Sequence, residues 1–248
     1  MLEFCHVSCT LKKKEILQDI SFTVDQGRIV ALLGRNGCGK TTLLRAANRE
    51  VSHGGSILLE GKPLSALSPR ERACGIGYLP QRLAAPAITV ASLVSLGRLP
   101  HIPPLSRPGE GDRAAVLEAM EATDTLRLAD RYIGELSGGE RQRAHLAMAL
   151  AQRTPFFMLD EPTAYLDTDA RRHFLALLSR LVRSEAKAAL CVLHDINDAI
   201  RLADDIALLE GGQLVFFGST AAFIEGDLPQ KHFGLTAHKC EGDLPFYF

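Results

Sequence analysis

A stretch near the N-terminus has the residue types and the spacing needed to bind phosphate. Residues 34–41, Gly-Arg-Asn-Gly-Cys-Gly-Lys-Thr, fit the pattern G-x-x-x-x-G-K-[ST] at every fixed position. In that pattern Lys40 reaches the β- and γ-phosphates of a nucleotide, and the Thr41 hydroxyl is a ligand of Mg²⁺. We expect the following residues to contact the nucleotide: Gly34, Asn36, Gly37, Cys38, Gly39, Lys40, Thr41 and Thr42. The alternative is a glycine-rich turn that binds nothing, which the strand-like run before it and the helix-forming run after it disfavour.

Two adjacent acids follow an apolar run later in the chain. Residues 156–159 are Phe-Phe-Met-Leu, and Asp160 and Glu161 come directly after them. A strand that ends in a carboxylate is what the Mg²⁺-binding aspartate of a phosphate-loop enzyme requires. We expect Asp160 to hold the metal through water and Glu161 to act as general base, which contributes roughly 10²–10⁴ to a rate. Two surface acids after a strand are common, so this pattern gains its meaning from the phosphate loop.

A third segment opens a predicted helix with a hydroxyl and glycine amides, which suits a second anion. Residues 136–143, Leu-Ser-Gly-Gly-Glu-Arg-Gln-Arg, resemble the signature of the ATP-binding subunits of ATP-binding-cassette (ABC) transporters, and the resemblance covers almost all of the chain. It implies that Ser137, Gly138 and Gly139 of one subunit cap the γ-phosphate held by the other. Two chains would then close head to tail, as a homodimer, over two molecules of ATP with Mg²⁺.

Other segments resemble the remaining motifs of that family, in the expected order. Residues 78–81, Tyr-Leu-Pro-Gln, resemble the Q-loop, whose Gln81 meets the Mg²⁺ site, takes part in catalysis and senses a membrane subunit. Residues 164–167, Ala-Tyr-Leu-Asp, resemble the D-loop, whose Asp167 reaches across the dimer. His194 lies in a segment that resembles the switch, which implies a contact with the γ-phosphate. A lone histidine after a strand is more often structural, but its order after the two acids favours the functional interpretation.

One position departs from the family pattern. The family places an aromatic residue against adenine about six residues before the leucine of the second strand, and counting back from Leu17 gives Leu11. Stacking contributes roughly 1–3 kcal/mol per base, and an aliphatic contact keeps only part of that. We therefore expect modest ATP affinity and weak base selectivity, or a platform supplied from elsewhere.

The elements that must position these residues alternate between strands and helices. The strand-like runs are 2–7, 20–24, 29–33, 56–60, 75–79, 156–159, 188–193, 206–209 and 213–217; the predicted helices are 40–49, one starting at 69, 90–96, 112–123, 138–152, 168–183 and 196–202. This order predicts an α/β fold with a mainly parallel sheet and a smaller antiparallel β layer. With the family resemblance, it implies a P-loop NTPase (RecA-like) domain over 1–248. Its α/β core would comprise 1–85 and 136–248, and a proline-rich helical insertion subdomain would comprise 86–135.

Composition restricts the classes of protein that fit. The formal net charge is −1, from 28 basic and 29 acidic residues, which gives no support to a nucleic-acid binder held by bulk charge. The six cysteines form no C-x-x-C pair and are expected to be reduced thiols of a cytoplasmic protein. No signal peptide and no run long enough to span a membrane is recognisable. If the protein works at a membrane, we expect it to do so through a partner. The resemblance to ABC transporter subunits then implies a peripheral protein on the cytoplasmic side of the inner membrane.

Residues 95–101, Ser-Leu-Gly-Arg-Leu-Pro-His, resemble a segment of iron-siderophore, haem and cobalamin importers. The resemblance implies an ATPase coupled to uptake of a metal chelate, with integral permease subunits as partners and, indirectly, a periplasmic or lipoprotein solute-binding protein. Manganese and zinc importers share parts of the pattern. A soluble ABC-type ATPase, such as an iron–sulfur cluster assembly factor, is the alternative from another class. The solute itself stays open, because the chain does not touch it in this family.

Cys38 lies inside the phosphate loop, one residue before Gly39 and Lys40. A helix N-terminus and an adjacent lysine both lower the pKa of a thiol, so one hypothesis is an exposed and reactive thiolate that Mg-ATP protects. The alternative is a small apolar residue packed under the loop and inert. Serine fits the space under either interpretation.

Overall fold

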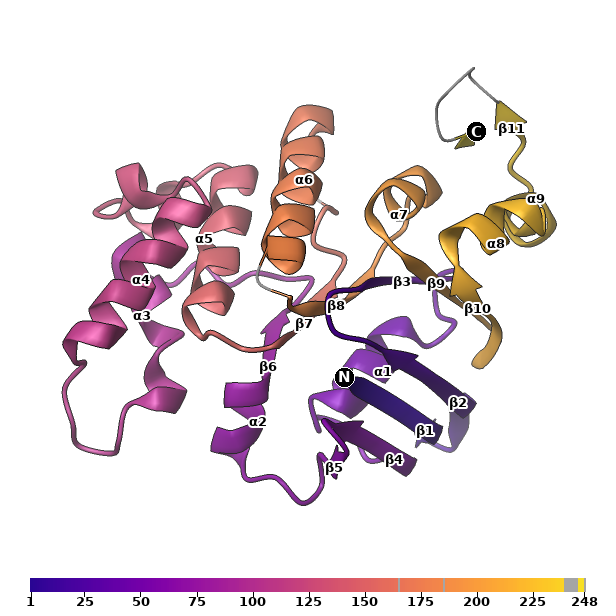
Figure 1. The fold of residues 1–248 in the computed structure, drawn as a ribbon, viewed down its shortest axis with the longest axis horizontal. Helices are drawn as coiled ribbons and strands as arrows, with labels where there is room; N and C mark the ends of the chain where they lie inside the picture. The colour runs from indigo at the N-terminus through magenta and orange to yellow at the C-terminus, as the bar shows by residue number, and fades with distance from the viewer. Residues whose placement is uncertain (165, 185, 239–244, 248) are drawn as a thin grey trace.

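The computed structural model describes residues 1–164, 166–184, 186–238 and 245–247. Its centre is a six-stranded sheet in the order β10-β9-β3-β8-β7-β6 (Figure 1). The strands are β3 (Ile29–Leu33), β6 (Ile76–Leu79), β7 (Phe156–Asp160), β8 (Ala188–Val192), β9 (Asp205–Glu210) and β10 (Gln213–Ser219). The pairs from β6 to β9 are parallel, and β10 pairs antiparallel with β9 through a hairpin. Because the carboxyl ends of parallel strands meet at one edge, the segments after β3, β6, β7 and β8 lie on the same side of the sheet.

A second sheet is antiparallel, in the order β2-β1-β4-β5. Its strands are β1 (Leu2–Leu11), β2 (Lys14–Val24), β4 (Gly54–Leu59) and β5 (Lys62–Pro63). Helix α1 (Lys40–Ala47) lies between the two sheets, with Leu43 and Leu44 fully buried in a core that both sheets share. Alternate residues of β3 serve the two faces of the central sheet, since Val30 and Leu32 join this core and Ala31 joins the other.

Three helices cover the opposite face of the central sheet: α5 (Gly138–Ala151), α6 (Thr168–Ser184) and α7 (Ile196–Leu202). At one end of the molecule α3 (Val90–Leu96) and α4 (Glu110–Ala122) pack against α5 (Figure 1). Short 3₁₀ turns, η1 (Leu99–His101), η2 (Leu126–Leu128) and η3 (Ile133–Glu135), connect these helices. Among the described residues, none of the helices combines the length and the apolar character needed to cross a bilayer.

The predicted fold class is confirmed, with parallel strands in the large sheet and an antiparallel sheet beside it. Two helix starts were predicted from their caps. Ser68 and Glu71 form a capping box at α2 (Pro69–Gly75), and the Thr89 side chain accepts a hydrogen bond from the Ser92 N–H at the start of α3.

Most boundaries differ from the prediction by one or more residues, and three of the differences have a local physical reason. The first two strands run on to Leu11 and back to Lys14, joined by a two-residue turn at Lys12 and Lys13 with φ of 49° and 67°. Both central residues of a type I′ turn need positive φ, which glycine and asparagine adopt most easily. Because two lysines occupy these positions, the sequence did not indicate a hairpin. Helix α4 begins two residues earlier than predicted, because Asp112 accepts a hydrogen bond from the Gly109 N–H and so stands inside the first turn.

Elements near the C-terminus were not predicted. They are α8 (Thr220–Glu225), α9 (Leu228–Phe233), β11 (Ala237–His238) and β12 (Phe246–Tyr247). The helices are too short to show a clear apolar period in the sequence. Tyr165 of the D-loop segment and the sixth cysteine, Cys240, lie outside the described residues.

Candidate nucleotide-binding site

The phosphate loop joins β3 to α1 by a backbone path that depends on glycine. Gly34, Gly37 and Gly39 have φ of 146°, 79° and 111°. A Cβ on Gly34 would lie 2.3 Å from the Leu209 carbonyl oxygen, and one on Gly39 would lie 2.6 Å from a methyl of Leu17. A Cβ on Gly37 would meet nothing within 4 Å, so only its backbone conformation requires glycine. The loop is therefore packed tightly from below and open on its outer side.

The loop and the start of α1 form a positively polarised pocket. Lys40 is 5% exposed, and its Nζ donates to the carbonyl oxygens of Gly34 (2.7 Å) and Arg35 (3.2 Å). Helix α1 has Gly39 at its N-cap and no side-chain cap. Its first N–H groups therefore have no side-chain partner at the end where the helix dipole is positive, which suits an anion. Asn36 and Gly37 are exposed at the rim of the loop, and Thr42 lies half-buried in the first turn of α1.

A hydroxyl and a carboxylate stand together beside the loop. Thr41 Oγ1 donates to Asp160 Oδ1 at 3.3 Å, and Asp160 is 1% exposed at the end of β7. Burial raises the pKa of the Asp160 carboxyl, and the hydrogen bond from Thr41 and the charge of Lys40 oppose that rise. Hard oxygen donors of this kind fit Mg²⁺, which takes few protein ligands and completes its octahedron with phosphate and water. Accordingly, no group of three or more His, Cys, Asp or Glu side chains among the described residues is arranged to enclose a metal.

The three residues predicted to be catalytic are in contact, because two of them bind the carboxylate of the third, Glu161. Gln81 Nε2, from the segment after β6, donates to Glu161 Oε2. His194 Nε2, from the segment after β8, lies 2.6 Å from Glu161 Oε1. Both oxygens of the predicted base are thus held, one from each neighbouring strand end.

Glu161 itself has an uncommon backbone. Its φ is 51°, and its N–H donates to the Val192 carbonyl oxygen of β8 at 3.2 Å. A left-handed conformation costs a non-glycine residue about 1–3 kcal/mol and persists where its surroundings enforce it. The turn after β7 points the two acids in different directions. The Asp160 side chain points toward Thr41, and the Glu161 side chain points toward His194 and Gln81.

The signature residues stand at the N-terminus of α5. Ser137 Oγ accepts a hydrogen bond from the Glu140 N–H (3.3 Å), and the Ser137 N–H donates to Glu140 Oε2 (3.0 Å). That backbone bond is the main reason why the pKa of Glu140 is lowered. Ser137 and Gly138 are exposed, and Gly139 is half-buried against Leu166 and Ala170.

The predicted D-loop residue also caps a helix. Asp167 is exposed, and its Oδ1 accepts from the Ala170 N–H at 2.8 Å in the first turn of α6. In the part of the chain that the structure describes, no hydrogen bond or ion pair joins Ser137, Gly138 or Asp167 to the phosphate loop of the same chain. These predicted ligands therefore form a group apart from the others.

The exposed-thiolate hypothesis for Cys38 is wrong. Cys38 is 7% exposed and belongs to the core beneath the loop, with its Sγ 4.0 Å from Lys40 Nζ. A Cβ on Gly34 would lie 2.6 Å from that sulfur, so the thiol fills the space under the first glycine. Leu11, where the family pattern has an aromatic residue, is half-buried and packs against the same core.

One contact to the loop was missed in the sequence. Arg35 occupies a variable position of the motif, yet its Nη2 donates to the His232 carbonyl oxygen of α9 at 3.1 Å. His232 Nδ1 in turn lies 3.1 Å from Glu210 Oε2. The only signal in the sequence was a cation where the pattern asks for no particular residue.

Comparison with known proteins gives consistent results. Residues 17–164 match the family described as ABC transporter. The chain is 38% identical over 224 residues to the iron(3+)-hydroxamate import ATP-binding protein FhuC of Bacillus subtilis, which covers 90% of this chain and 83% of that protein. It is 39% identical over 225 residues to the ferric enterobactin transport ATP-binding protein FepC of Escherichia coli, with coverage of 90% and 83%. It is 39% identical over 235 residues to the hemin import ATP-binding protein HmuV of Myxococcus xanthus, with coverage of 91% and 86%.

Solved structures show the same fold. A putative metal-chelate type ABC transporter in an inward-facing conformation matches with a TM-score of 0.83 and 26% identity, over 99% of this chain and 97% of that chain. A dimeric ATP-binding cassette in a post-hydrolysis state, bound to ADP and Pi, matches with a TM-score of 0.76 and 26% identity, over 89% and 99%.

Proposed function

The chain belongs to the ABC transporter family, and we propose that it is the ATP-hydrolysing subunit of an importer for a metal chelate of the ferric siderophore, haem or cobalamin type. The observation that carries the proposal is the edge of the central sheet. There a lysine-bearing loop, a hydroxyl–carboxylate pair and a glutamate held by two polar side chains lie at the ends of adjacent parallel strands. The relatives' names supply the class of solute.

Binding of the triphosphate is assigned to the loop and to α1. Lys40 exchanges its bonds to the loop carbonyls for phosphate oxygens, and the uncapped N–H groups of α1 add further donors. Thr41 and Asp160 would hold Mg²⁺, which would neutralise part of the negative charge of the phosphates. The buried position of Asp160, which disfavours its charged form, makes a cation at this place favourable.

Hydrolysis is assigned to the three residues that meet at Glu161. The Glu161 carboxylate takes the proton of the attacking water as that water bonds to the γ-phosphorus. The bond from the γ-phosphorus to the oxygen it shares with the β-phosphate breaks, and ADP leaves with that oxygen. Gln81 and His194 orient the carboxylate, and His194 also stands ready to donate to the γ-phosphate. One of the two side chains must release an oxygen of Glu161 before water can bind there, so nucleotide binding and the arrangement of these groups are linked.

The dimer is the part of the proposal that explains the second group of ligands. Ser137, Gly138, Gly139 and Asp167 are set apart from their own Lys40 loop, and they serve the nucleotide of a second copy. The dimeric cassette with ADP and Pi, which shares this fold, supports such an arrangement. Each ATP would lie between Lys40 of one chain and Ser137 of the other.

A membrane partner would dock on the predicted helical subdomain, residues 86–135. A groove of about 580 Å³ lies between α2 and the segment after α3, with Arg70, Leu99 and Leu105 among the residues that line it. Leu99 and Leu105 are exposed apolar side chains there. We propose that permease subunits cover this groove, which places the chain at the cytoplasmic side of the inner membrane, with a solute-binding protein on the far side.

The test combines the chain with a candidate polytopic permease, which we expect to find among the products of neighbouring genes. Proteoliposomes that hold the complex should release phosphate from Mg-ATP and accumulate a ferric hydroxamate, ferric enterobactin or hemin, and the Glu161→Gln complex should do neither. A complex that hydrolyses ATP but moves none of these chelates, and takes up Mn²⁺ or Zn²⁺ instead, would overturn the metal-chelate assignment. A chain that binds no permease would point to a soluble ATPase.

A further inference from the structure

Residues 95–101 present two kinds of side chain in two directions. Leu99 is 60% exposed and lines the groove between α2 and the segment after α3. Arg98, its neighbour, is 8% exposed and points away from solvent. This segment therefore has an outer side, which lines the groove, and an inner side, which is buried.

The inner side of this segment lies on the last turn of α5. A Cβ on Gly97 would lie 2.2 Å from the Met148 carbonyl oxygen, so only glycine lets the backbones approach this closely. Arg98 Nη1 donates to the Ala151 carbonyl oxygen at 2.6 Å, and His101 Nε2 lies 2.7 Å from the carbonyl oxygen of Gln152. Because a carbonyl oxygen only accepts, His101 is the donor in that bond.

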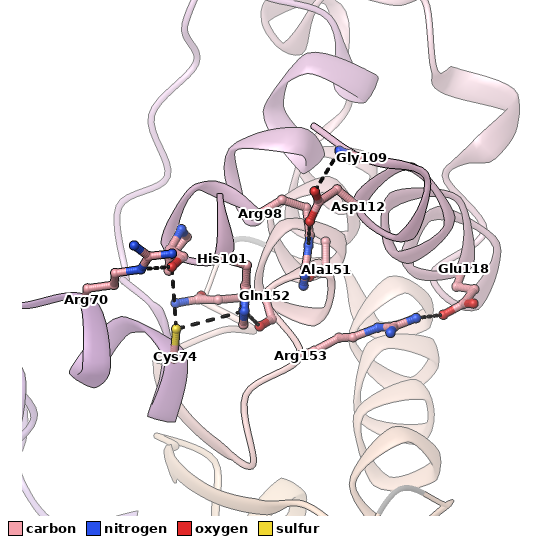
Figure 2. A network of polar contacts seen from close by, with 11 residues as sticks. Arg70, Cys74, Arg98, His101, Gly109, Asp112, Glu118, Ala151, Gln152 and Arg153 are labelled. Carbon is pink, nitrogen blue, oxygen red and sulfur yellow. Dashed lines mark hydrogen bonds and ion pairs between the residues drawn. The ribbon is translucent and has the colours of Figure 1, made fainter. Parts of the chain in front are cut away.

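These contacts meet a specific need of the helix. The last carbonyl groups of a helix lack partners within it and carry partial negative charge, which a cation or an N–H donor stabilises. Figure 2 shows Arg98 and His101 converging on the end of α5 from the same side.

The same residues connect this end of α5 to the neighbouring helices. Arg98 Nε donates to Asp112 Oδ1 of α4 at 3.0 Å, and the Gln152 side chain donates to the Ala73 carbonyl oxygen of α2. Arg70 of α2 donates to the Pro100 carbonyl oxygen at 2.6 Å (Figure 2). The groove segment, α2, α4 and the C-terminal end of α5 therefore form one polar network.

The other end of α5 is the signature. Its 14 residues begin directly after Ser137, and at ~1.5 Å per residue they span about 21 Å. A capping box closes the N-terminal end, and most of the helix between is buried in the core. Because the helix is continuous from Ser137 to its C-terminal end, the contacts at that end help to set the place of Ser137.

We infer that Arg98 and His101 are positioning residues for the signature. They fix the C-terminal end of α5 to the segment that lines the groove, and through α5 they set the place of Ser137 against the nucleotide of the opposite subunit. A partner that moves this segment would move Ser137. The inference rests on the proposed function, because it needs the composite site of a head-to-tail dimer.

The test uses the full chain with Glu161→Gln as parent, in which ATP-bound dimers should persist. Adding Arg98→Gln removes the charge and the fork that joins Ala151 to Asp112. Sedimentation in Mg-ATP measures the chain concentration at which half of the chains are dimeric. We expect this concentration to rise roughly tenfold. The ATP affinity of the monomer, which depends on its own Lys40 loop, should change less than about twofold, well under the 1.4 kcal/mol of a tenfold change.

Two further variants keep the test decisive. Arg153→Gln is the matched control, since the Arg153 side chain pairs with Glu118 at 2.5 Å. The bond from the Arg153 backbone N–H to the Leu150 carbonyl oxygen of α5 survives the substitution, so this variant should dimerise as the parent does. Arg98→Lys keeps the charge but not the planar fork, and should give an intermediate value. Should Arg98→Gln fail to fold, as judged by its thermal transition, Arg98→Lys decides by the same measurement.

The inference is overturned if the folded Arg98 variants dimerise as the parent does, or if Arg153→Gln weakens dimerisation equally. Either result leaves the proposed function intact. The inference would also be overturned if the monomer lost enough ATP affinity to explain the whole weakening of dimerisation. The substitution would then act on the chain's own Lys40 loop and not on Ser137. A parent that forms no dimer with ATP would overturn the proposed composite site, and this inference with it.

Discussion

Replacing Glu161 by glutamine tests the assignment of the base with little change to the structure. Glu161 Oε2 accepts from Gln81, and Oε1 lies 2.6 Å from His194 Nε2. A glutamine at 161 has the same shape, with one oxygen to accept from Gln81 and one NH₂ that can donate to an unprotonated ring nitrogen at position 194. Both contacts survive the change, so the fold and the ATP affinity should stay near those of the native chain.

The rate should fall steeply all the same. An amide takes no proton from water, and loss of a general base costs roughly 10²–10⁴ in rate. That factor corresponds to about 2.7–5.5 kcal/mol in the activation free energy. The ATP-bound dimer should accumulate, because its phosphate contacts remain while its breakdown is blocked.

The assay pairs steady-state phosphate release with gel filtration in Mg-ATP. Glu118→Gln is a matched control, since it makes the same chemical change at an exposed acid that pairs with Arg153. It should leave both readouts as they are. Turnover of Glu161→Gln within about tenfold of the native rate would refute the base assignment, because so small a loss is below what a base contributes.

The other predictions are checked by turnover and dimerisation, and some also by ATP affinity, Tm or thiol labelling. His194→Ala should lower turnover strongly and ATP affinity little, because a contact that strengthens as charge develops acts on the transition state; equal losses in both would indicate a ground-state role only. Ser137→Arg should abolish hydrolysis while ATP still binds, and mixing it with Lys40→Ala should restore one composite site per mixed dimer; mixed dimers without any activity would contradict the head-to-tail arrangement. Asp160→Asn should abolish Mg²⁺-dependent turnover but raise Tm by a few degrees, because the pKa of the buried acid is raised and its ionised form destabilises the fold. That gain should shrink as the pH falls through the raised pKa and the native carboxyl becomes protonated, and a constant or negative difference in Tm would contradict it. Cys38→Ser should stay active, and the native thiol should react with a maleimide slowly until the chain unfolds; rapid labelling of the folded chain would contradict its burial.

Much of the candidate site could be predicted because its residues follow buried parallel strands. An apolar run followed by a glycine loop or by acids fixes both the element and the edge of the sheet, as at Lys40 and Asp160. Residue types and spacing alone do not say which ligands share one chain's site, and in the sequence only the family resemblance divided them between two subunits. The placement of Ser137 and Asp167 at helix starts apart from the loop agrees with that division.

What the sequence could not provide lies mainly in irregular segments. Residues 97–101 have neither the period of a helix nor that of a strand, so nothing in the pattern says that Leu99 faces out while Arg98 faces in. The position of Cys38 was misjudged for a related reason. Its neighbours in sequence favour a thiolate, but the tight path at Gly34 places the sulfur beneath the loop.

The order of strands in the central sheet has a consequence for when the site can form during synthesis of the chain. Strand β3, which leads into the phosphate loop, pairs with β8, and Ile29 lies opposite Ala189. Strand β7, which delivers the two acids, lies on the far side of β8. Parallel pairings between segments so distant in sequence form late, because the loop between them must close first. During synthesis the loop, the acids and the histidine cannot be aligned until β8 has emerged and inserted between β3 and β7, so the catalytic edge of the sheet can form only after residues up to His194 have been made.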